Sequence, residues 1–359
     1  MDGTTTMTDR QKWSQPTRSS SPRTTLVRQY LSAWRGAKIY RVPLVDEKGV
    51  PVGNNGDRLM LLGTDVVFRD LGLTACDRPE DADLIVFASS GGMLEKMQRI
   101  PHLFRTLCAE FPATPMCVLP SSYLWGTRPF RDEIGRRTAP TVLFCREAHS
   151  FRHLTNDHGL AAVDPERIED AGIGDDGIGV LLDPDMAFEL ESEPVVTQRR
   201  DAAQSTVVMV ERTDVEHVSV GMNSKKLGLR KKIARHTPPW LKRALYPAVN
   251  AARATRRTTF REQCEAMLRE HCPEAVDLKR DIADVSNVNT CPFESFCDRI
   301  AAARVVFTTR LHAGIFGAML GRRTFVFEGS YHKVRGIYEL SMADREYVTF
   351  VSDRPNANA

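Results

Sequence analysis

An arginine and a histidine two positions apart, Arg310 and His312, have side chains well suited to chemistry. A guanidinium is a permanent, fork-shaped cation, and an imidazole titrates near neutral pH. Together they could hold a phosphate or a carboxylate and donate a proton. The simpler alternative is a surface arginine beside a histidine that only packs or caps, and the spacing alone leaves both interpretations open.

The residues around this pair predict a strand, a helix and a second strand. Val305–Phe307 is an apolar run typical of a buried strand, and Thr308 or Thr309 is a good helix N-cap. Gly321 is expected to end the helix, and Thr324–Phe327 to begin the next strand. The pair then lies in the first helical turn, beyond the carboxyl end of a strand. Open α/β sheets bind ligands there, and the helix dipole favours anions.

Length and composition bound the protein class. The 359 residues are about right for two α/β domains, and 42% hydrophobic with 26% charged residues is typical of a soluble globular protein. No apolar run approaches the ~20 residues of a spanning helix, and the polar N-terminus does not resemble a secretory signal. The eight cysteines are scattered without a C-x-x-C pair. They predict buried thiols in a reducing cytoplasm, and we expect neither a disulfide nor a metal framework.

Three predicted strands in the first half end in polar or small residues. These strands are Asp83–Gly92, Ala113–Ser122 and Pro140–Glu147. Because carboxyl ends of parallel strands share one edge, we expect their last residues to face a common crevice. The candidates at these ends are Gly91, Gly92, Ser121, Arg146 and Glu147. For Arg146 and Glu147, a local ion pair at a helix start is an equally good interpretation.

Two loops of the first half add further candidates. The Gly53–Arg58 loop, with Asn55 and Asp57, runs into a helix and lets the backbone approach a ligand, although a turn with a capping aspartate is the commoner use. In the Asp183-Pro-Asp185 sequence, turn chemistry explains at least one acid. We assign the functional role, that of proton acceptor, to Asp185.

The second half contains a segment of unusual charge, residues 225–261. It has twelve lysines and arginines and no acidic residue, with Trp240 and Tyr246 interleaved. Such a segment suits an anionic membrane surface, and a solvated insertion is the alternative. We expect no nucleic-acid partner, because no recognised module is present. Further along, Ser330, Tyr331 and Lys333 follow a predicted strand, and Lys333 offers a point charge for phosphate.

These patterns predict a chain of four parts. Residues 1–35 are expected to be a flexible basic arm that includes a short helix from Leu26 to Trp34. Residues 36–195 and 196–352 are expected to form two domains, joined through a charged linker at 191–204. Residues 353–359 are expected to fray.

Taken together, the motifs resemble those of the polysaccharide pyruvyl transferase family. The closest matches are Thr309-Arg-Leu-His-Ala-Gly-Ile-Phe316 and Gly329-Ser-Tyr-His-Lys333. Supporting matches are Gly53–Asp57, Ser90–Gly92, Leu119–Ser122, Arg146-Glu147 with Ser150, and Pro184–Phe188. They occur in the family's order from about residue 50 to 340. Two departures are Ser121, where many members have glutamine, and His332, which replaces a common glycine.

The resemblance implies an α/β fold of two Rossmann-like domains that face a cleft, as in GT-B enzymes. It also implies pyruvyl transfer from phosphoenolpyruvate, with no other cofactor, onto a glycan that is free or lipid-linked. His312 is the candidate acid, and Asp185 or Glu147 the candidate base. The candidate substrate-binding residues are Arg310, Leu311, Arg146, Lys333, Ser330, Tyr331, Asn55, Asp57, Gly91, Gly92 and Ser121. The protein is expected in the cytoplasm, either free or peripherally bound at the inner face of the membrane, and the oligomeric state is left open.

Two other functions compete with this interpretation. One is a sugar-nucleotide glycosyltransferase of the same GT-B architecture, because a fold does not determine a function. The other is a non-catalytic, membrane-associated scaffold for polysaccharide export, in which the basic segment 225–261 is the functional element.

Overall fold

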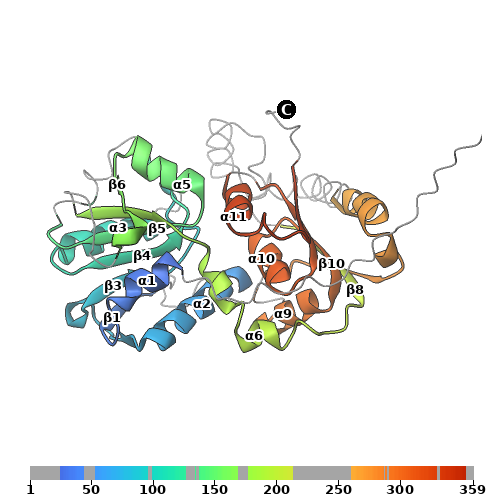
Figure 1. The fold of residues 1–359 in the computed structure, drawn as a ribbon, viewed down its shortest axis with the longest axis horizontal. Helices are drawn as coiled ribbons and strands as arrows, with labels where there is room; N and C mark the ends of the chain where they lie inside the picture. The colour runs from blue at the N-terminus through green and yellow to red at the C-terminus, as the bar shows by residue number, and fades with distance from the viewer. Residues whose placement is uncertain are drawn as a thin grey trace, which may run out of the picture.

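Two parallel β-sheets with helices packed against them form the described part of the chain, so the predicted α/β class is confirmed (Figure 1). The computed structural model describes residues 25–43, 53–95, 99–126, 134, 137–168, 177–212, 260–286, 288, 291–329 and 332–352. One sheet belongs to the N-terminal half of the chain and the other to the C-terminal half.

The N-terminal half carries a seven-stranded sheet in the order β2-β1-β3-β4-β5-β7-β6. Its strands are β1 (Lys38–Val42), β2 (Thr74–Ala75), β3 (Leu84–Phe87), β4 (Met116–Ser121), β5 (Thr141–Cys145), β6 (Ala161–Ala162) and β7 (Ile178–Leu182). Every residue of β3, β4 and β5 is buried, as continuous apolar runs predict for strands covered on both faces. The predicted common edge is present, because the Arg146 N–H donates to the Ser121 carbonyl and the Ser122 N–H to the Ser90 carbonyl.

The C-terminal half carries a five-stranded sheet in the order β12-β11-β10-β8-β9. Its strands are β8 (Thr206–Val210), β9 (Lys279–Ile282), β10 (Ala303–Thr308), β11 (Arg323–Phe327) and β12 (Val348–Val351). The predicted unit is confirmed as β10, α10 (Leu311–Met319) and β11, and Gly321 with φ 69° follows the helix end. A Cβ on Gly317 would lie 2.7 Å from Thr324 Oγ1, so α10 packs closely on β11.

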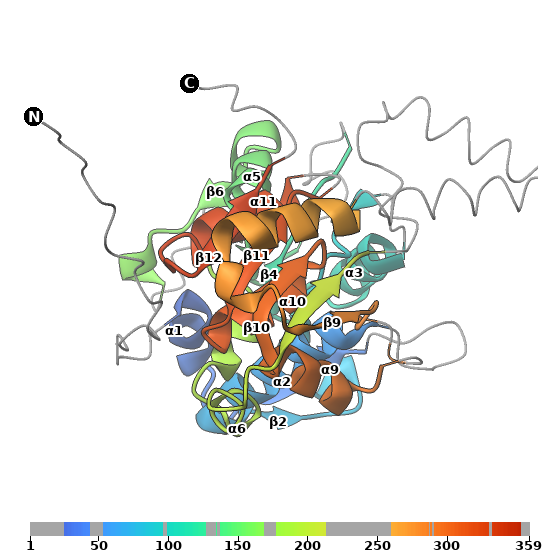
Figure 2. The ribbon, with the colours of Figure 1, turned by 90° about the vertical axis from the view of Figure 1, so that its right-hand side faces the viewer.

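The remaining helices cover these sheets. They are α1 (Leu26–Ser32), α2 (Asn55–Leu71), α3 (Arg99–Glu110), α5 (Ala148–Arg152), α6 (Pro194–Thr197), α9 (Phe293–Ala301) and α11 (Lys333–Ser341). Shorter turns are η1 (Pro79–Asp81), η3 (His153–Asp157), η4 (Pro165–Arg167), η5 (Met186–Leu190) and η7 (Pro273–Ala275), and residues 260–271 are helical. Figures 1 and 2 both place α5 of the N-terminal half beside α11 of the C-terminal half, and the two helices are in contact.

Helix α2 connects the two halves. A Cβ on Gly63 would lie 1.9 Å from the Met186 carbonyl oxygen, so glycine allows α2 to lie directly on η5. At the start of α2, the Asn55 side-chain amide donates to the carbonyl oxygens of Val285 and Cys291, at 2.7 and 2.8 Å. One apolar core runs without interruption from the first sheet to the second. The junction between the halves is therefore tightly packed around α2.

Helix α1 corrects the predicted N-terminal arm. Its residues Val27 and Leu31 are fully buried in the core. Both carboxylate oxygens of Asp183 accept hydrogen bonds from the N–H groups of Leu26 and Val27, at 3.2 and 2.8 Å. Residues 25–35 are therefore part of the folded N-terminal half, because an apolar face and a buried acid hold the helix in place.

Other differences concern short elements. The two-residue strands β2 and β6, and strand β12, have no separate pattern in the sequence. The segment 191–204 contains the short helix α6. Short edge elements depend on the sheet beside them, so local patterns alone do not predict them.

Candidate active site

The centre of the candidate site is a cluster of Arg146, Asp185 and His312. Arg146 follows β5, Asp185 is the N-cap of η5, and His312 lies in the first turn of α10. Arg146 Nη1 is 2.7 Å from Asp185 Oδ2, and His312 Nε2 is 3.5 Å from the same oxygen. Arg146 and Asp185 are fully buried, and the His312 side chain is 12% exposed. The fold thus brings a carboxylate of the first half to the histidine of the second.

The negative charge of Asp185 balances the positive charge of Arg146. Burial by itself would raise the pKa of Asp185, but His312, Arg146 and the N–H of Ala187 together hold that pKa well below its ordinary value. Asp185 is therefore ionised at neutral pH. A fixed carboxylate beside an imidazole orients the ring. An imidazole held in one orientation is suited to proton transfer.

Gly56, in the first turn of α2, lies directly against the imidazole. A Cβ at this position would be 2.3 Å from His312 Nδ1 and 2.6 Å from its Cγ. Any side chain at position 56 would therefore push the ring out of place. Gly56 lies within the candidate Gly53–Arg58 loop. No local pattern distinguishes it from the other residues of that loop, because only the fold brings it to His312.

A second meeting point of charges lies at Gly91. A Cβ built there would be 2.7 Å from Lys333 Nζ and 3.1 Å from Arg146 Nη2. Arg146 Nη2 is buried and makes no hydrogen bond within the described residues. Lys333 begins α11, so the two cations come from different halves of the chain. Arg146 and Lys333 therefore meet beside a glycine that has no side chain, and Arg146 Nη2 can still donate a hydrogen bond. Such a site is suited to an anion.

Apart from Gly91, the predicted serine and glycine residues at this edge bond to the backbone and to one another. Ser121 is fully buried; its hydroxyl donates to the Leu119 carbonyl and accepts from the Ser90 N–H. The Gly92 N–H donates to Ser90 Oγ. Ser122 was not a candidate, yet its hydroxyl accepts from Arg146 Nε at 3.0 Å and holds the guanidinium.

Arg310 and its neighbours differ in detail from the prediction. The predicted threonine N-cap is wrong: the N-cap of α10 is Arg310, and Thr308 Oγ1 accepts from the Arg310 N–H instead. Arg310 is 9% exposed, and its Nη2 donates to Asp284 at 2.8 Å. Its charge is therefore already partly balanced. Leu311 is buried in the apolar core beneath the site.

Asn55 and Asp57 hold the backbone at the start of α2. Asn54 is the N-cap, its side chain accepts from the N–H groups of Gly56 and Asp57, and Asp57 Oδ2 accepts from the Asn54 N–H. This is a capping box, and it confirms that Asp57 helps to cap the helix. Asn55 is fully buried with its amide on two carbonyl groups of the other half, so both side chains act structurally here.

A second pairing of acid and histidine lies between α5 and α11. Glu147 is fully buried, caps α5 through the Ser150 N–H at 2.8 Å and also contacts the Ser150 hydroxyl. Burial raises the pKa of Glu147, and hydrogen bonds from Ser150 and the charge of Arg146 oppose that rise. His332 Nε2 is 3.7 Å from Glu147 Oε1, and the His332 and His149 rings stack with centroids 3.5 Å apart. His149 was not a candidate, and no spacing in the sequence points to it.

Several predicted features lie outside the described residues. They are Ser330 and Tyr331, the arm at 1–24, the tail at 353–359 and the basic segment except for residues 260 and 261. All eight cysteines are described, and each is a free thiol.

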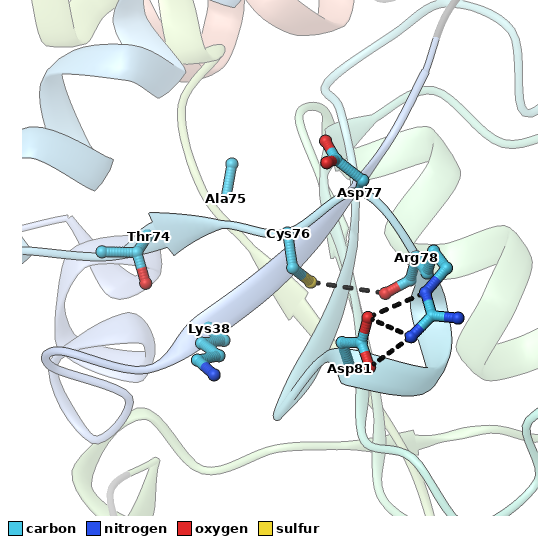
Figure 3. Close-up of a pocket in the computed structure, with 7 residues that line it drawn as sticks. All are labelled: Lys38, Thr74, Ala75, Cys76, Asp77, Arg78 and Asp81. Atoms are coloured by element: carbon cyan, nitrogen blue, oxygen red, sulfur yellow. Dashed lines mark hydrogen bonds and ion pairs between the residues drawn. The ribbon is translucent and has the colours of Figure 1, made fainter.

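A surface hollow lies apart from this site, at the edge strand β2 (Figure 3). Its lining residues are Lys38, Thr74, Ala75, Cys76, Asp77, Arg78 and Asp81. Arg78 is paired with Asp81, and both side chains are largely exposed. The hollow contains no buried charge and no part of the cluster around His312.

Comparisons with known proteins agree with this architecture. The structure is similar to the crystal structure of an uncharacterized protein from Klebsiella pneumoniae, with a TM-score of 0.52 and 16% sequence identity. The match covers 90% of this chain and 96% of that one, and at this identity it supports the fold alone. Within the described part of the chain, no helix has the length and apolar character to cross a bilayer.

The sequence was also compared with curated proteins and protein families. None of the curated proteins matches the chain. The model of the polysaccharide pyruvyl transferase family matches residues 8–331, which include every element of the candidate site except α11 and His332 before it. The chain therefore belongs to the polysaccharide pyruvyl transferase family.

Proposed function

We propose that the protein transfers the pyruvyl group of phosphoenolpyruvate to two hydroxyls of a glycan, forming a cyclic ketal and releasing phosphate. The observation that carries the proposal is the meeting of Arg146 and Lys333 at Gly91, beside the pairing of His312 with Asp185. The family supports the transfer of pyruvate to a polysaccharide or its precursor. The phosphoenolpyruvate donor and the ketal product belong to our proposal: the resemblance to the family implies them, and the charges of the site support them.

The donor fits these charges. Phosphoenolpyruvate carries a phosphate and a carboxylate on a small planar enol. Arg146 Nη2 and Lys333 Nζ would bind one anionic group at Gly91. Arg310, at the start of α10, is the candidate for the other group, together with the helix dipole. A glycan is the acceptor, either free or lipid-linked.

The first step joins a hydroxyl oxygen of the glycan to C2 of the donor. The protonated His312 imidazole gives its proton to the methylene carbon, which becomes a methyl group. The neutral imidazole then takes up the proton of the hydroxyl. The product is a tetrahedral ketal that still carries phosphate. We assign Asp185 to orientation of His312 rather than to proton removal, because its lowered pKa makes it a weak base.

The second step breaks the bond between C2 and the phosphate oxygen. The phosphate leaves with the electron pair, and Arg146 and Lys333 stabilise its charge. The second hydroxyl attacks C2, and its proton leaves with the phosphate. The two hydroxyl protons thus end on the methyl group and on phosphate, and the atoms balance.

We further propose that 36–195 and 196–352 are two Rossmann-like domains facing a cleft, as in GT-B enzymes. Supporting this arrangement, the residues of the site come from both sheets: Arg146 and Asp185 from the first half, His312 and Lys333 from the second. The site would then depend on the relative position of the two domains.

The protein would work at the cytoplasmic face of a membrane, where the basic segment 225–261 would bind anionic lipid. Its twelve cationic and no acidic residues support this attraction. Sedimentation with anionic vesicles, with and without residues 225–259, tests it. Equal binding by both proteins would remove the segment from membrane attachment.

The central experiment is an assay of the purified full-length protein with phosphoenolpyruvate and a panel of glycans. Release of inorganic phosphate and the mass of the glycan product are measured. We expect phosphate release that depends on the glycan, together with a pyruvyl mass increment. UDP- and GDP-sugars serve as alternative donors. Glycan elongation from a nucleotide sugar, with no consumption of phosphoenolpyruvate, would overturn the proposal.

A further inference from the structure

Three side chains of metal-binding type converge beside the candidate active site. They are Glu147 and His149 at the start of α5, and His332 immediately before α11. One ligand atom from each residue lies within 4.8 Å of the others. Among the described histidines, cysteines and acidic residues, these three are close enough together to bind one metal ion.

We propose that Glu147, His149 and His332 bind a divalent transition-metal ion, such as Zn²⁺, which ties α5 to α11. Two imidazoles and one carboxylate are a ligand set that Zn²⁺ commonly uses, with a fourth position left for water or a ligand. The set spans both halves of the chain, because α5 follows a strand of the first sheet and α11 a strand of the second.

The distances suit an ion of this size. Ligand atoms about 2.0–2.2 Å from a tetrahedral Zn²⁺ lie roughly 3.4 Å from one another. His332 Nε2 and Glu147 Oε1 are already 3.7 Å apart. The two imidazoles are nearly parallel, with an angle of 8° between their planes. Because a metal lies in the plane of each ring that binds it, the rings must splay on binding, and the partly exposed His149 and His332 have room to do so.

The surroundings also suit metal binding. Glu147 is fixed by Ser150, whose N–H and hydroxyl contact its carboxylate, and such bonds orient a metal ligand. An ion pair between Glu147 and a protonated His332 would stabilise the carboxylate less, because the 3.7 Å between Glu147 Oε1 and His332 Nε2 exceeds a hydrogen-bond distance. A single divalent ion would balance the buried carboxylate and engage both rings.

The site has a consequence for its neighbours. Glu147 directly follows Arg146, and His332 directly precedes Lys333. An ion held by Glu147 and His332 would therefore set the distance between the two cations that meet at Gly91. We assign the ion a positioning role: it holds the halves together at the anion site, and no chemical step passes through it.

The test uses the untagged full-length protein, freed of metal by a chelator and dialysed. Zn²⁺ binding is measured by calorimetry, and Co²⁺ binding by its visible absorption, both without phosphoenolpyruvate. We expect one ion per chain. His332→Ala and His149→Ala should each weaken binding by about 100-fold or more, because loss of a group that only orients a ligand already costs about 10–100-fold. Because the readout is binding without donor, it is independent of the proposed reaction.

Matched controls separate this site from other metal-binding groups. His102→Ala removes an exposed histidine of α3, and Cys76→Ser removes the cysteine that is not fully buried. Both variants should bind Zn²⁺ as the unaltered protein does. Zn²⁺ should also raise the melting temperature of the unaltered protein but not that of His332→Ala. Glu147→Gln is a poorer test because Glu147 also caps α5. Binding of equal strength by the unaltered protein, His149→Ala and His332→Ala would overturn the proposal.

Discussion

Two histidines that follow strands of the five-stranded sheet lie close to two buried acids that follow strands of the seven-stranded sheet. His312 follows β10 and lies 3.5 Å from Asp185, and His332 follows β11 and lies 3.7 Å from Glu147. The pairs look alike, yet the pKa of Asp185 is lowered and that of Glu147 is raised. For Asp185, His312 makes the largest contribution that lowers the pKa, followed by Arg146, whose Nη1 is 2.7 Å from Asp185 Oδ2. For Glu147, burial outweighs the hydrogen bonds from Ser150 and the charge of Arg146.

This comparison separates two uses of the same residue types. A buried carboxylate beside both a histidine and a guanidinium is ionised at neutral pH and can orient the histidine. A buried carboxylate without such a partner binds a proton, or a metal ion, more readily. The first pair is therefore suited to proton transfer, and the second to holding an ion.

The largest expected effect comes from removing one histidine at a time. His312→Ala should lower turnover of phosphoenolpyruvate by about 10²–10⁴-fold, because it removes the proposed proton donor. His332→Ala should lower it less, because it affects only the position of Lys333. Phosphate release under saturating donor is the measurement, with circular dichroism as the check of folding. Equal losses in both variants would erase the distinction between the pairs.

The next effect concerns the acids. Asp185→Asn removes the charge that balances Arg146, so we expect the free energy of unfolding to fall by about 3–5 kcal/mol. Glu147→Gln leaves no buried cation unpaired and should cost about 1 kcal/mol, typical of one weakened hydrogen bond. Urea unfolding at pH 7 measures both. A larger loss for Glu147→Gln would reverse our assignment of the balanced pair.

A third buried acid, Asp183, extends the comparison to the pH dependence of stability. Asp183 accepts only backbone N–H groups, and burial raises its pKa to about 7. Because the folded state binds this proton more tightly than the unfolded chain, the stabilising effect is present below about pH 4 and is lost as pH rises to 7. Relative to Asp183→Asn, the natural protein should lose up to about 4 kcal/mol over that range.

Urea unfolding of both proteins at several pH values measures this difference, in which the other titrating groups cancel. Asp185→Asn should behave in the opposite way, because its folded pKa is lowered. The benefit of the Asp185 charge persists above about pH 4 and is lost only in stronger acid. A difference between the natural protein and Asp183→Asn that is constant with pH would contradict the raised pKa.

The smallest effects come from two helical glycines. A Cβ on Gly56 would meet His312, and one on Gly336 would lie 2.8 Å from the Cβ of Glu147. Each alanine variant should lose about 1–3 kcal/mol of stability through overpacking. Gly56→Ala should also lower turnover, whereas Gly336→Ala should mainly weaken Zn²⁺ binding. If Gly56→Ala left the rate unchanged, the close packing on His312 would be irrelevant to activity.

Much of the fold could be predicted because its signals are local. The apolar runs at β3, β4, β5 and β10 mark strands buried on both faces, and Gly321 marks the end of α10. The structure places Asp185 3.5 Å from His312, whereas Asp183 binds the start of α1, and a functional role for Asp185 stays a prediction.

Other parts could not be predicted, because they depend on contacts between distant residues. Gly56 and His312 are far apart in the sequence, as are Glu147 and His332, and no local pattern joins them. The pairing of Arg310 with Asp284 likewise joins residues that no local pattern connects.

The sequence by itself determined which residue types stand at the ends of which strands, because apolar periodicity and turn residues act over a few neighbours. It also carried the motifs of the pyruvyl transferase family. Only the tertiary structure decided which acid faces which histidine and which of these acids has an arginine partner. The reason is physical: burial and the distance between charges set a pKa or a metal affinity, and both quantities exist only once the two sheets have packed around α2.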